Sequence, residues 1–270
     1  ITPDPARKAA LVHQKGRVLE DVLGRKQDAG DAYATALELD PGNPVILRSL
    51  SDRYIEEKRW SDLERVLKQA ANSVSDDPRH RAALVAWRAR LAEREANDPE
   101  KATELYEIAL RLDPRASGAL AALKRLHHAH RRWRDLIRVL SVEAELTEQA
   151  EVATSALFRI GQLHSQRLGN RDEAITALER AVEFAPGDAI ILDELARLYE
   201  EAGRWDALAK VLQQLTQTAR DHTARLGLLH RIGDLYATRL NQEAGAIHWF
   251  AAALAIESTH LPTLQALAPL

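Results

Sequence analysis

The 270-residue sequence contains no cysteine and no methionine. Without cysteine there can be no disulfide framework, no thiolate nucleophile and no cysteine-ligated metal centre. Aromatic residues make up only 5% of the chain, whereas Leu, Ala, Arg and Glu dominate it, and this composition favours helices over strands. A chain that begins at Ile1 and lacks methionine is expected to be a piece of a longer protein. We therefore predict an all-α fold.

The sequence also lacks an excess of charge of one sign. The 37 Lys and Arg residues nearly balance the 40 Asp and Glu residues, giving a net charge of −3, whereas nucleic-acid binders usually carry a basic excess. No signal sequence opens the chain, and the longest nearly apolar run, residues 244–256, is too short to span a bilayer. We predict neither nucleic-acid binding nor membrane insertion. Cytoplasm and periplasm are both compatible, with the cytoplasm favoured.

A repeat of 72 or 73 residues runs through the chain. The dipeptide Arg-Trp recurs at this spacing, at Trp60, Trp133 and Trp205. Pro41, Pro114, Pro186 and Ser258 share a second register, and alanines lie twelve and five residues before each of them. A bulky residue lies eight before, at Tyr33, Tyr106, Leu178 and Phe250. Alanines let two helices approach closely, the bulky side chain fills the space beside them, and proline ends the helix.

This spacing resembles the second helix of the tetratricopeptide repeat, in which alanine, an aromatic residue, alanine and proline follow in that order. The family's small position in the first helix holds Gly16, Ala89, Gly161 and Gly233. Each unit of 72 or 73 residues then contains two repeats. The second departs from the pattern, because Leu63, Leu136 and Leu208 replace the first alanine and the closing proline is missing.

The resemblance implies a right-handed α-solenoid of about seven helix pairs plus a final single helix, similar to large bacterial tetratricopeptide scaffold proteins. The expected repeats lie near residues 9–42, 44–77, 82–115, 117–150, 154–187, 189–222 and 226–259, with a half repeat at 261–268. No linker-like segment interrupts them, so we predict a single solenoid over residues 1–270.

Two kinds of helix start are expected. Pro44, Pro78 and Pro99 each follow Asn or Asp, the arrangement of an N-cap residue and the first helical residue. Ser61 with Glu64, and Asn170 with Glu173, have the spacing of a capping box.

The usual catalytic and phosphate-binding motifs are missing. The nearest approach to a metal site is His127 and His130, spaced i, i+3 with His128 beside them, but no further ligand lies at a matching spacing. These histidines also suit a helix C-terminus, where they complement the helix dipole. We predict no catalytic residue, no metal site, no cofactor and no enzymatic activity.

The resemblance further implies a concave groove lined by the first helix of each pair. Arginine forks pair with carboxylates and rings supply contact area, so we expect the groove to bind a segment of another protein, with an acidic segment favoured. Alternatively, Arg17 with Asp21 and Arg197 with Glu201 are i, i+4 pairs that satisfy each other in solvent. The predicted groove residues are His13, Arg17, Arg48, Asp52, Trp87, Arg90, Arg125, Phe158, Arg159, Gln162, Asp193, Arg197, His230, Arg231 and Asp234.

A second surface is expected near the end of the chain. Ala251, Ala252 and Ala255 occupy positions that are mostly polar in the other copies of this helix. Either the next helix and further repeats cover this face, or it mediates self-association. The functional hypotheses are a protein-interaction scaffold, a recruitment module of a larger enzyme or sensor whose catalytic domain lies outside these residues, and, weakened by the charge balance, a nucleic-acid-binding helical repeat.

Overall fold

The computed structural model describes residues 4–74 and 76–270. It confirms the all-α prediction, because 81% of the chain is helical and the described residues form no strand. The chain divides into two compact units, residues 1–132 and 133–270. The expectation of a single solenoid over the whole chain stays a prediction.

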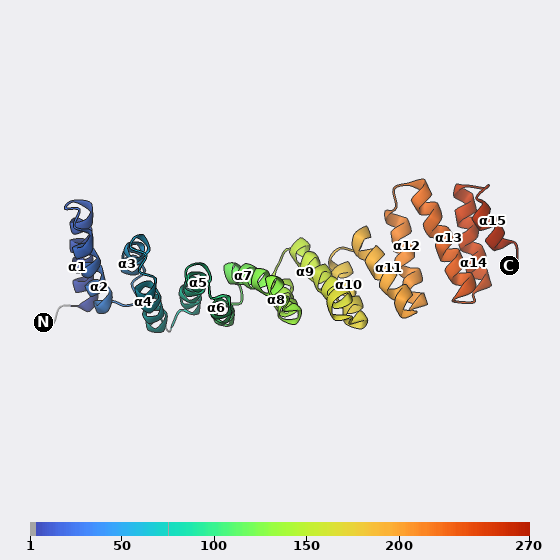
Figure 1. The fold of residues 1–270 in the computed structure, drawn as a ribbon. Coiled ribbons are helices and arrows are strands. Elements are labelled where there is room, and N and C mark those ends of the chain that lie inside the picture. The colour runs from blue at the N-terminus through green and yellow to red at the C-terminus, as the bar shows by residue number, and fades with distance from the viewer. Residues whose placement is uncertain (1–3, 75) are drawn as a thin grey trace. The chain divides into compact units, whose positions relative to one another are not determined.

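The first unit consists of seven helices that pack in chain order, each against the next (Figure 1). The first helices of its pairs are α1, α3, α5 and α7. The bounds are α1 (Pro5–Asp21), α2 (Lys26–Leu39), α3 (Pro44–Glu56), α4 (Trp60–Ser73), α5 (Pro78–Arg94), α6 (Pro99–Leu112) and α7 (Ser117–Ala129).

The second unit contains the remaining eight α-helices of the described chain, and a π-helical turn, η1 (His164–Leu168), continues α9. From α9 onward it repeats the same alternation of first and second helices. The bounds are α8 (Trp133–Leu146), α9 (Ala150–Leu163), α10 (Arg171–Phe184), α11 (Ala189–Ala202), α12 (Trp205–Thr218), α13 (His222–Thr238), α14 (Glu243–Ile256) and α15 (Leu261–Leu267).

One backbone feature recurs in the turn between the two helices of every pair. A single residue with positive φ lies two positions before the second helix begins, and these residues are Gly24, Lys58, Asn97, Arg131, Gly169, Gly203 and Asn241. The amide of the next residue then bonds back to the first helix, as from Arg59 to the Tyr54 carbonyl at 2.8 Å. The turn therefore satisfies carbonyls at the end of one helix while it starts the next.

This turn explains why the two predicted capping boxes do not form. Helix α4 begins at Trp60 rather than after Ser61, and the Asn170 side chain makes no capping hydrogen bond. In the turn before α10 the Asn170 amide already donates to the His164 carbonyl at 2.9 Å, so it is not free for the Glu173 side chain. Asn43, Asp77 and Asp98 cap their helices as predicted, each followed by the expected proline.

The core of each unit lies where the two helices of a pair approach closely. The paired alanines and the bulky residue between them are fully or almost fully buried, as Ala29, Tyr33 and Ala36 show. Gly16 on α1 faces the ring of Tyr33, and a Cβ atom there would lie 2.5 Å from a ring carbon. Gly233 meets the Phe250 ring at the same distance. The close approach therefore depends on a missing side chain.

We expect Gly16→Ala to lower the free energy of unfolding by about 1–3 kcal/mol, because the added methyl must displace the Tyr33 ring. The third pair accommodates Ala89 at this position, so the variant should still fold. Gly30→Ala is the matched control, because nothing lies within 4 Å of its added Cβ and alanine is the better helix former. Urea unfolding should show a lower midpoint for the first variant and an unchanged or higher one for the second.

Lys58 holds a left-handed conformation, with φ of 55°, at the position where the second unit has Gly203. Lys58→Gly should stabilise the chain by about 0.5–1 kcal/mol, because glycine adopts this conformation without steric cost. Lys68→Gly in the middle of α4 should instead destabilise it by about 1 kcal/mol. Unfolding midpoints that fall for both variants would contradict the assigned turn.

Candidate functional site

Most of the charged side chains predicted to line the groove are exposed on the first helices but are already paired with acids of this chain. Such pairs leave little unmatched charge for a partner. The contacts are Arg17 with Asp21 at 3.4 Å, Arg48 with Asp52 at 4.0 Å, Arg125 with Glu93, Arg197 with Glu201 and with Glu194 at 2.5 Å, and Arg231 with Glu200 at 2.5 Å.

Three other polar groove residues, Gln162, Asp193 and Asp234, form no ion pair with a described residue. The Gln162 side chain accepts a hydrogen bond from Arg159 at 3.4 Å. Asp193 and Asp234 are exposed and form no ion pair with any described residue. The two acids therefore add negative charge to the first helices of the second unit.

The two predicted groove histidines contact their neighbours in the structure. His13 is only 9% exposed, its Nε2 lies 2.9 Å from Ser49 Oγ, and its ring lies beside Tyr33. His230 Nδ1 lies 3.1 Å from Thr263 Oγ1, and its ring lies beside Phe250. Burial lowers the pKa of both rings, helped by the charge of Arg17 at His13 and of His260 at His230. Both imidazoles are thus held between helices.

A buried ion-pair network that the sequence analysis missed joins α1, α2 and α3. Arg53 is only 3% exposed and donates to Glu20 and to Glu56, each at 2.8 Å. The Tyr33 hydroxyl donates to the other Glu20 oxygen at 2.8 Å. Burial raises the pKa of Glu20, but the hydrogen bonds from Arg53 and Tyr33 outweigh it and the net pKa is lowered. The available signal was Arg53 itself, at a core position where the later copies have leucine.

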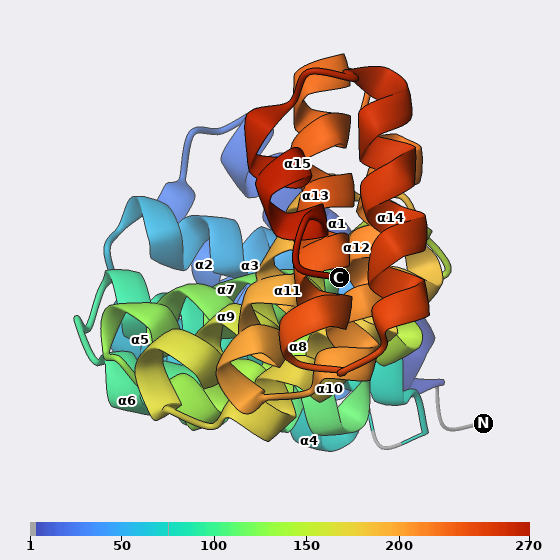
Figure 2. The ribbon, with the colours of Figure 1, turned by 90° about the vertical axis from the view of Figure 1, so that its right-hand side faces the viewer.

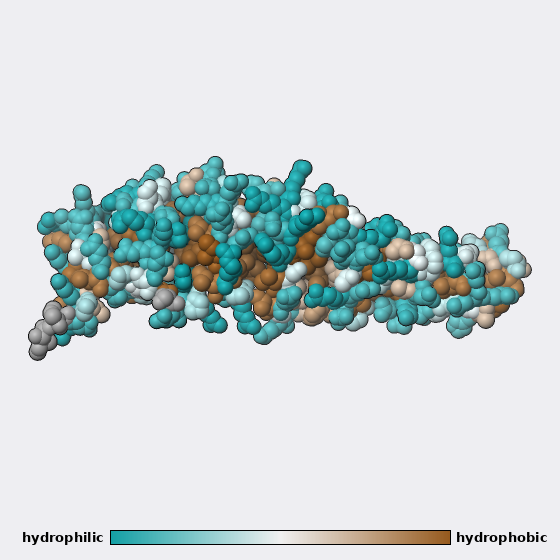
Figure 3. All heavy atoms as spheres, turned by 90° about the horizontal axis from the view of Figure 1, so that it is seen from below, coloured by the Kyte–Doolittle hydropathy of each residue, from teal (hydrophilic) through white to brown (hydrophobic). Residues whose placement is uncertain are grey.

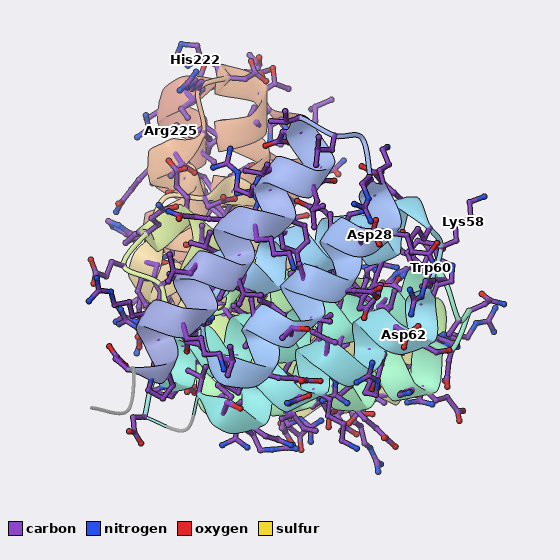
Figure 4. The ribbon with its side chains drawn as sticks, turned by 90° about the vertical axis from the view of Figure 1, so that its left-hand side faces the viewer. Asp28, Lys58, Trp60, Asp62, His222 and Arg225 are labelled. Atoms are coloured by element: carbon purple, nitrogen blue, oxygen red, sulfur yellow. The ribbon has the colours of Figure 1, made fainter. Side chains whose placement is uncertain are left out.

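Two adjoining cavities in the first unit bring predicted and unpredicted residues together around Trp60. The larger, here named the Arg90 cavity, has a volume of about 460 Å³ and is lined by Ile55, Trp60, Leu63, Trp87, Arg90, Leu91, Arg94 and Glu95. The smaller, the Lys101 cavity, has about 420 Å³ and is lined by Trp60, Ser61, Glu64, Leu91, Ala92, Glu95, Ala96 and Lys101. Figure 4 shows Trp60 beside Lys58, near the turn between α3 and α4.

The Arg90 cavity contains a groove arginine whose charge is not matched by an acid. Neither Arg90 nor Arg94 forms an ion pair with a described residue, and both side chains are exposed at the cavity rim. Trp60 and Trp87 supply aromatic surface beside them. Trp87 and Arg90 were predicted from the sequence, whereas Trp60 and Arg94 were not, because these two lie near helix ends outside the family's groove positions.

The second unit has an apolar cavity of its own, of about 330 Å³, which we name the Phe158 cavity. It lies between α9, the end of α10 and the start of α11. Phe158 was a predicted groove residue, whereas Phe184 and Ile190 were not and are 46% and 70% exposed. Exposed apolar side chains beside a cavity are a common feature of binding sites.

Helix α15 lies against α13 and α14 near the end of the second unit (Figure 2). Ala251 and Ala255 remain exposed, and so do Ile247 and Leu264. Self-association through this face stays a prediction.

Within the described residues, no helix is long and apolar enough to cross a membrane, and no group of His, Asp and Glu could hold a metal ion. Hydrophilic residues cover much of the face in Figure 3, with apolar residues visible between them.

These helix pairs, close-packed through alanines and a bulky residue, define a helical-repeat protein. Residues 167–232 match the family model described as tetratricopeptide repeat. The spacing of alanines and a bulky residue recurs in α2, α6 and α14. Residues 167–232 thus belong to the tetratricopeptide repeat family.

The chain is similar to known proteins both in sequence and in structure. Over 166 residues the chain is 29% identical to cellulose synthase operon protein C of Xanthomonas axonopodis pv. citri (strain 306), covering 60% of this chain but 10% of that protein. The structure is similar to one described as Naa15/Naa10 bound to HypK-THB, with a TM-score of 0.51, 14% identity and coverage of 97% of this chain and 39% of that chain. A tetratricopeptide repeat protein from Parabacteroides merdae ATCC 43184 aligns with a TM-score of 0.42, 17% identity and coverage of 97% and 98%.

Because the pKa of His13 is lowered in the folded state, the unfolded chain binds more protons as the pH falls below about 6.5. The free energy of unfolding should therefore decrease between about pH 7.5 and about pH 5.5, by at most about 1.4 kcal/mol per pH unit for this group. His13→Phe should flatten this dependence, since Phe158 occupies the equivalent position in the second unit.

Urea unfolding at several pH values measures the effect. The exposed His222, labelled in Figure 4, offers the control variant His222→Gln, which should keep the wild-type dependence. An unchanged pH dependence in His13→Phe would show that the pKa of His13 is the same in the folded and the unfolded chain.

Proposed function

We propose that this chain is a non-catalytic scaffold that binds an acidic segment of another protein on the first helices of its pairs. The observation that supports this most is the Arg90 cavity. There two unpaired guanidinium groups flank the aromatic surface of Trp60 and Trp87. Arginine and tryptophan are the residues that most often dominate protein interfaces, and a carboxylate can pair with each free arginine fork.

The exposure of the cavity supports a peptide rather than a small substrate. The lining contains no pair of side chains arranged as nucleophile and base, and its polar groups lie at the rim. An extended or helical segment could place an apolar side chain against the indoles and its carboxylates on Arg90 and Arg94. Arg17, Arg48, Arg125, Arg197 and Arg231 are paired with acids of this chain and would contribute mainly packing surface.

The Phe158 cavity is proposed as a second, apolar contact in the other unit. Its exposed Phe184 and Ile190 can receive an aliphatic or aromatic side chain without any charge requirement. The related structure described as Naa15/Naa10 bound to HypK-THB is a complex of proteins, which agrees with a binding role for this fold.

Selection of peptides from a random displayed library on the intact chain tests the proposal. We expect enriched peptides to contain Asp or Glu next to a large apolar residue. The double variant Arg90→Glu/Arg94→Glu should bind a selected peptide at least about tenfold more weakly, because two charge-assisted contacts become repulsive.

The matched control is Arg79→Glu/Arg111→Glu, which makes the same change in net charge at exposed positions outside the cavity. It should retain peptide binding, and both double variants should unfold near the wild-type temperature. Equal loss of binding in both double variants would show that the net charge of the chain, rather than the Arg90 cavity, determines peptide binding. Selected peptides without acidic residues would overturn the acidic-segment proposal.

A further inference from the structure

The copies of the Arg-Trp motif differ in what covers the indole ring. In the second unit the Arg167 guanidinium lies 5.5 Å from the centre of the Trp133 ring, and Arg239 lies 5.0 Å from that of Trp205. Each of these arginines stands two residues before the positive-φ residue of its turn. The residue at this position after Trp60 is Glu95. A carboxylate cannot replace a cation on the negative face of an indole.

Two further residues near the end of α5 are smaller than their counterparts in the second unit. Ala92 and Ala96 stand where the later copies have His164 with Leu168, and Tyr236 with Leu240. Tyr236 and Leu240 pack on the core of the second unit, and the Tyr236 ring closes over Gly245. Gly245 is the counterpart of Lys101. The Lys101 cavity thus occupies space that a ring, a leucine and an arginine take up in the second unit.

The charges around the Lys101 cavity leave one acid unmatched. Glu64 lies 2.8 Å from Arg88 and 3.9 Å from Lys101, so its charge is balanced. Glu95 lines the cavity beside Trp60 and forms no ion pair with a described residue. Arg90 and Arg94 belong to the lining of the Arg90 cavity only.

We propose that the Lys101 cavity binds an arginine side chain of the partner protein, stacked on Trp60 and paired with Glu95. The guanidinium takes the place that Arg167 and Arg239 occupy in the other two copies. Arginine suits the site better than lysine, because its planar group stacks on an indole while its edge donates to a carboxylate. The inference rests on the proposed function in that a bound protein supplies the arginine.

Together with the Arg90 cavity, this site specifies the order of charges in the partner. Trp60, Leu91 and Glu95 line both cavities, so the two are adjacent. A segment that places carboxylates on Arg90 and Arg94 would set its arginine only a short distance away, in the adjoining cavity that also contains Trp60. The preferred segment therefore carries acidic residues and an arginine close together.

Titration of the intact chain with N-acetyl-arginine amide, followed by the indole NH signals of the five tryptophans in a ¹⁵N-labelled sample, tests the site without any protein partner. Assignment uses single Trp→Phe variants. We expect the Trp60 signal to shift saturably in the millimolar range, which is the affinity of a single side chain. The Trp133 and Trp205 signals should shift less, because Arg167 and Arg239 already stack on those rings.

N-acetyl-citrulline amide, which has the same shape without the charge, is the control ligand. It should bind about two- to fivefold more weakly, and Glu95→Gln should weaken arginine binding by a similar factor. Glu95→Arg supplies the covering guanidinium from this chain, as in the other two copies, and should abolish the Trp60 shift while preserving the unfolding temperature. Arg79→Gln, at an exposed position outside both cavities, should leave the shift unchanged.

Equal shifts with arginine and citrulline, or equal shifts of all three motif tryptophans, would overturn the proposal. A Trp60 shift that persists in the Glu95→Arg variant would also overturn it. These outcomes are independent of the peptide selection, which depends on Arg90 and Arg94. Failure of the arginine site and failure of the acidic-segment function can therefore be distinguished.

Discussion

The close approach of the two helices in the pairs α1/α2, α5/α6, α9/α10 and α13/α14 is the contact on which the rest of the structure depends. It requires a residue without a side chain, or with only a methyl group, opposite a bulky one, as at Gly16 against Tyr33 and Gly233 against Phe250. Once this distance is fixed, the connecting turn must reverse the chain in very few residues. A single positive-φ residue and one backbone hydrogen bond to the first helix achieve this in every pair.

Because the same pair is built repeatedly, each copy serves as a control for the others. Positions that keep their character, such as the buried alanines, maintain the fold. Positions that change character carry the features particular to this chain. Arg53 replaces a core leucine and ties α3 to Glu20 of α1. Glu95, Ala92 and Ala96 replace larger residues or a cation and open a cavity beside Trp60.

The charges on the first helices illustrate a general feature of helical surfaces. Four of the seven residues at one recurring groove position are arginine, yet Arg17, Arg125 and Arg197 each contact an acid of this chain. Ion pairs at this level of exposure contribute little to stability, but they cancel the field that a partner would meet. Arg90 is the exception of the four. Its position beside two tryptophans, rather than its charge alone, makes it the centre of the proposed site.

The sequence by itself determined the fold class, the repeat period, the residues that pack each pair and the proline-marked helix starts, because these depend on local spacing along one helix or between two adjacent ones. It also identified Trp87 and Arg90. Only the tertiary structure decided which arginines are paired, since Glu93 and Glu200 reach Arg125 and Arg231 from other helices. It also showed that the capping boxes do not form, because α4 begins at Trp60, before Ser61, and the turn before α10 already uses the Asn170 amide. The cavities around Trp60 likewise depend on α5 packing against α4, and contact across helices of different pairs leaves no fixed spacing in the sequence.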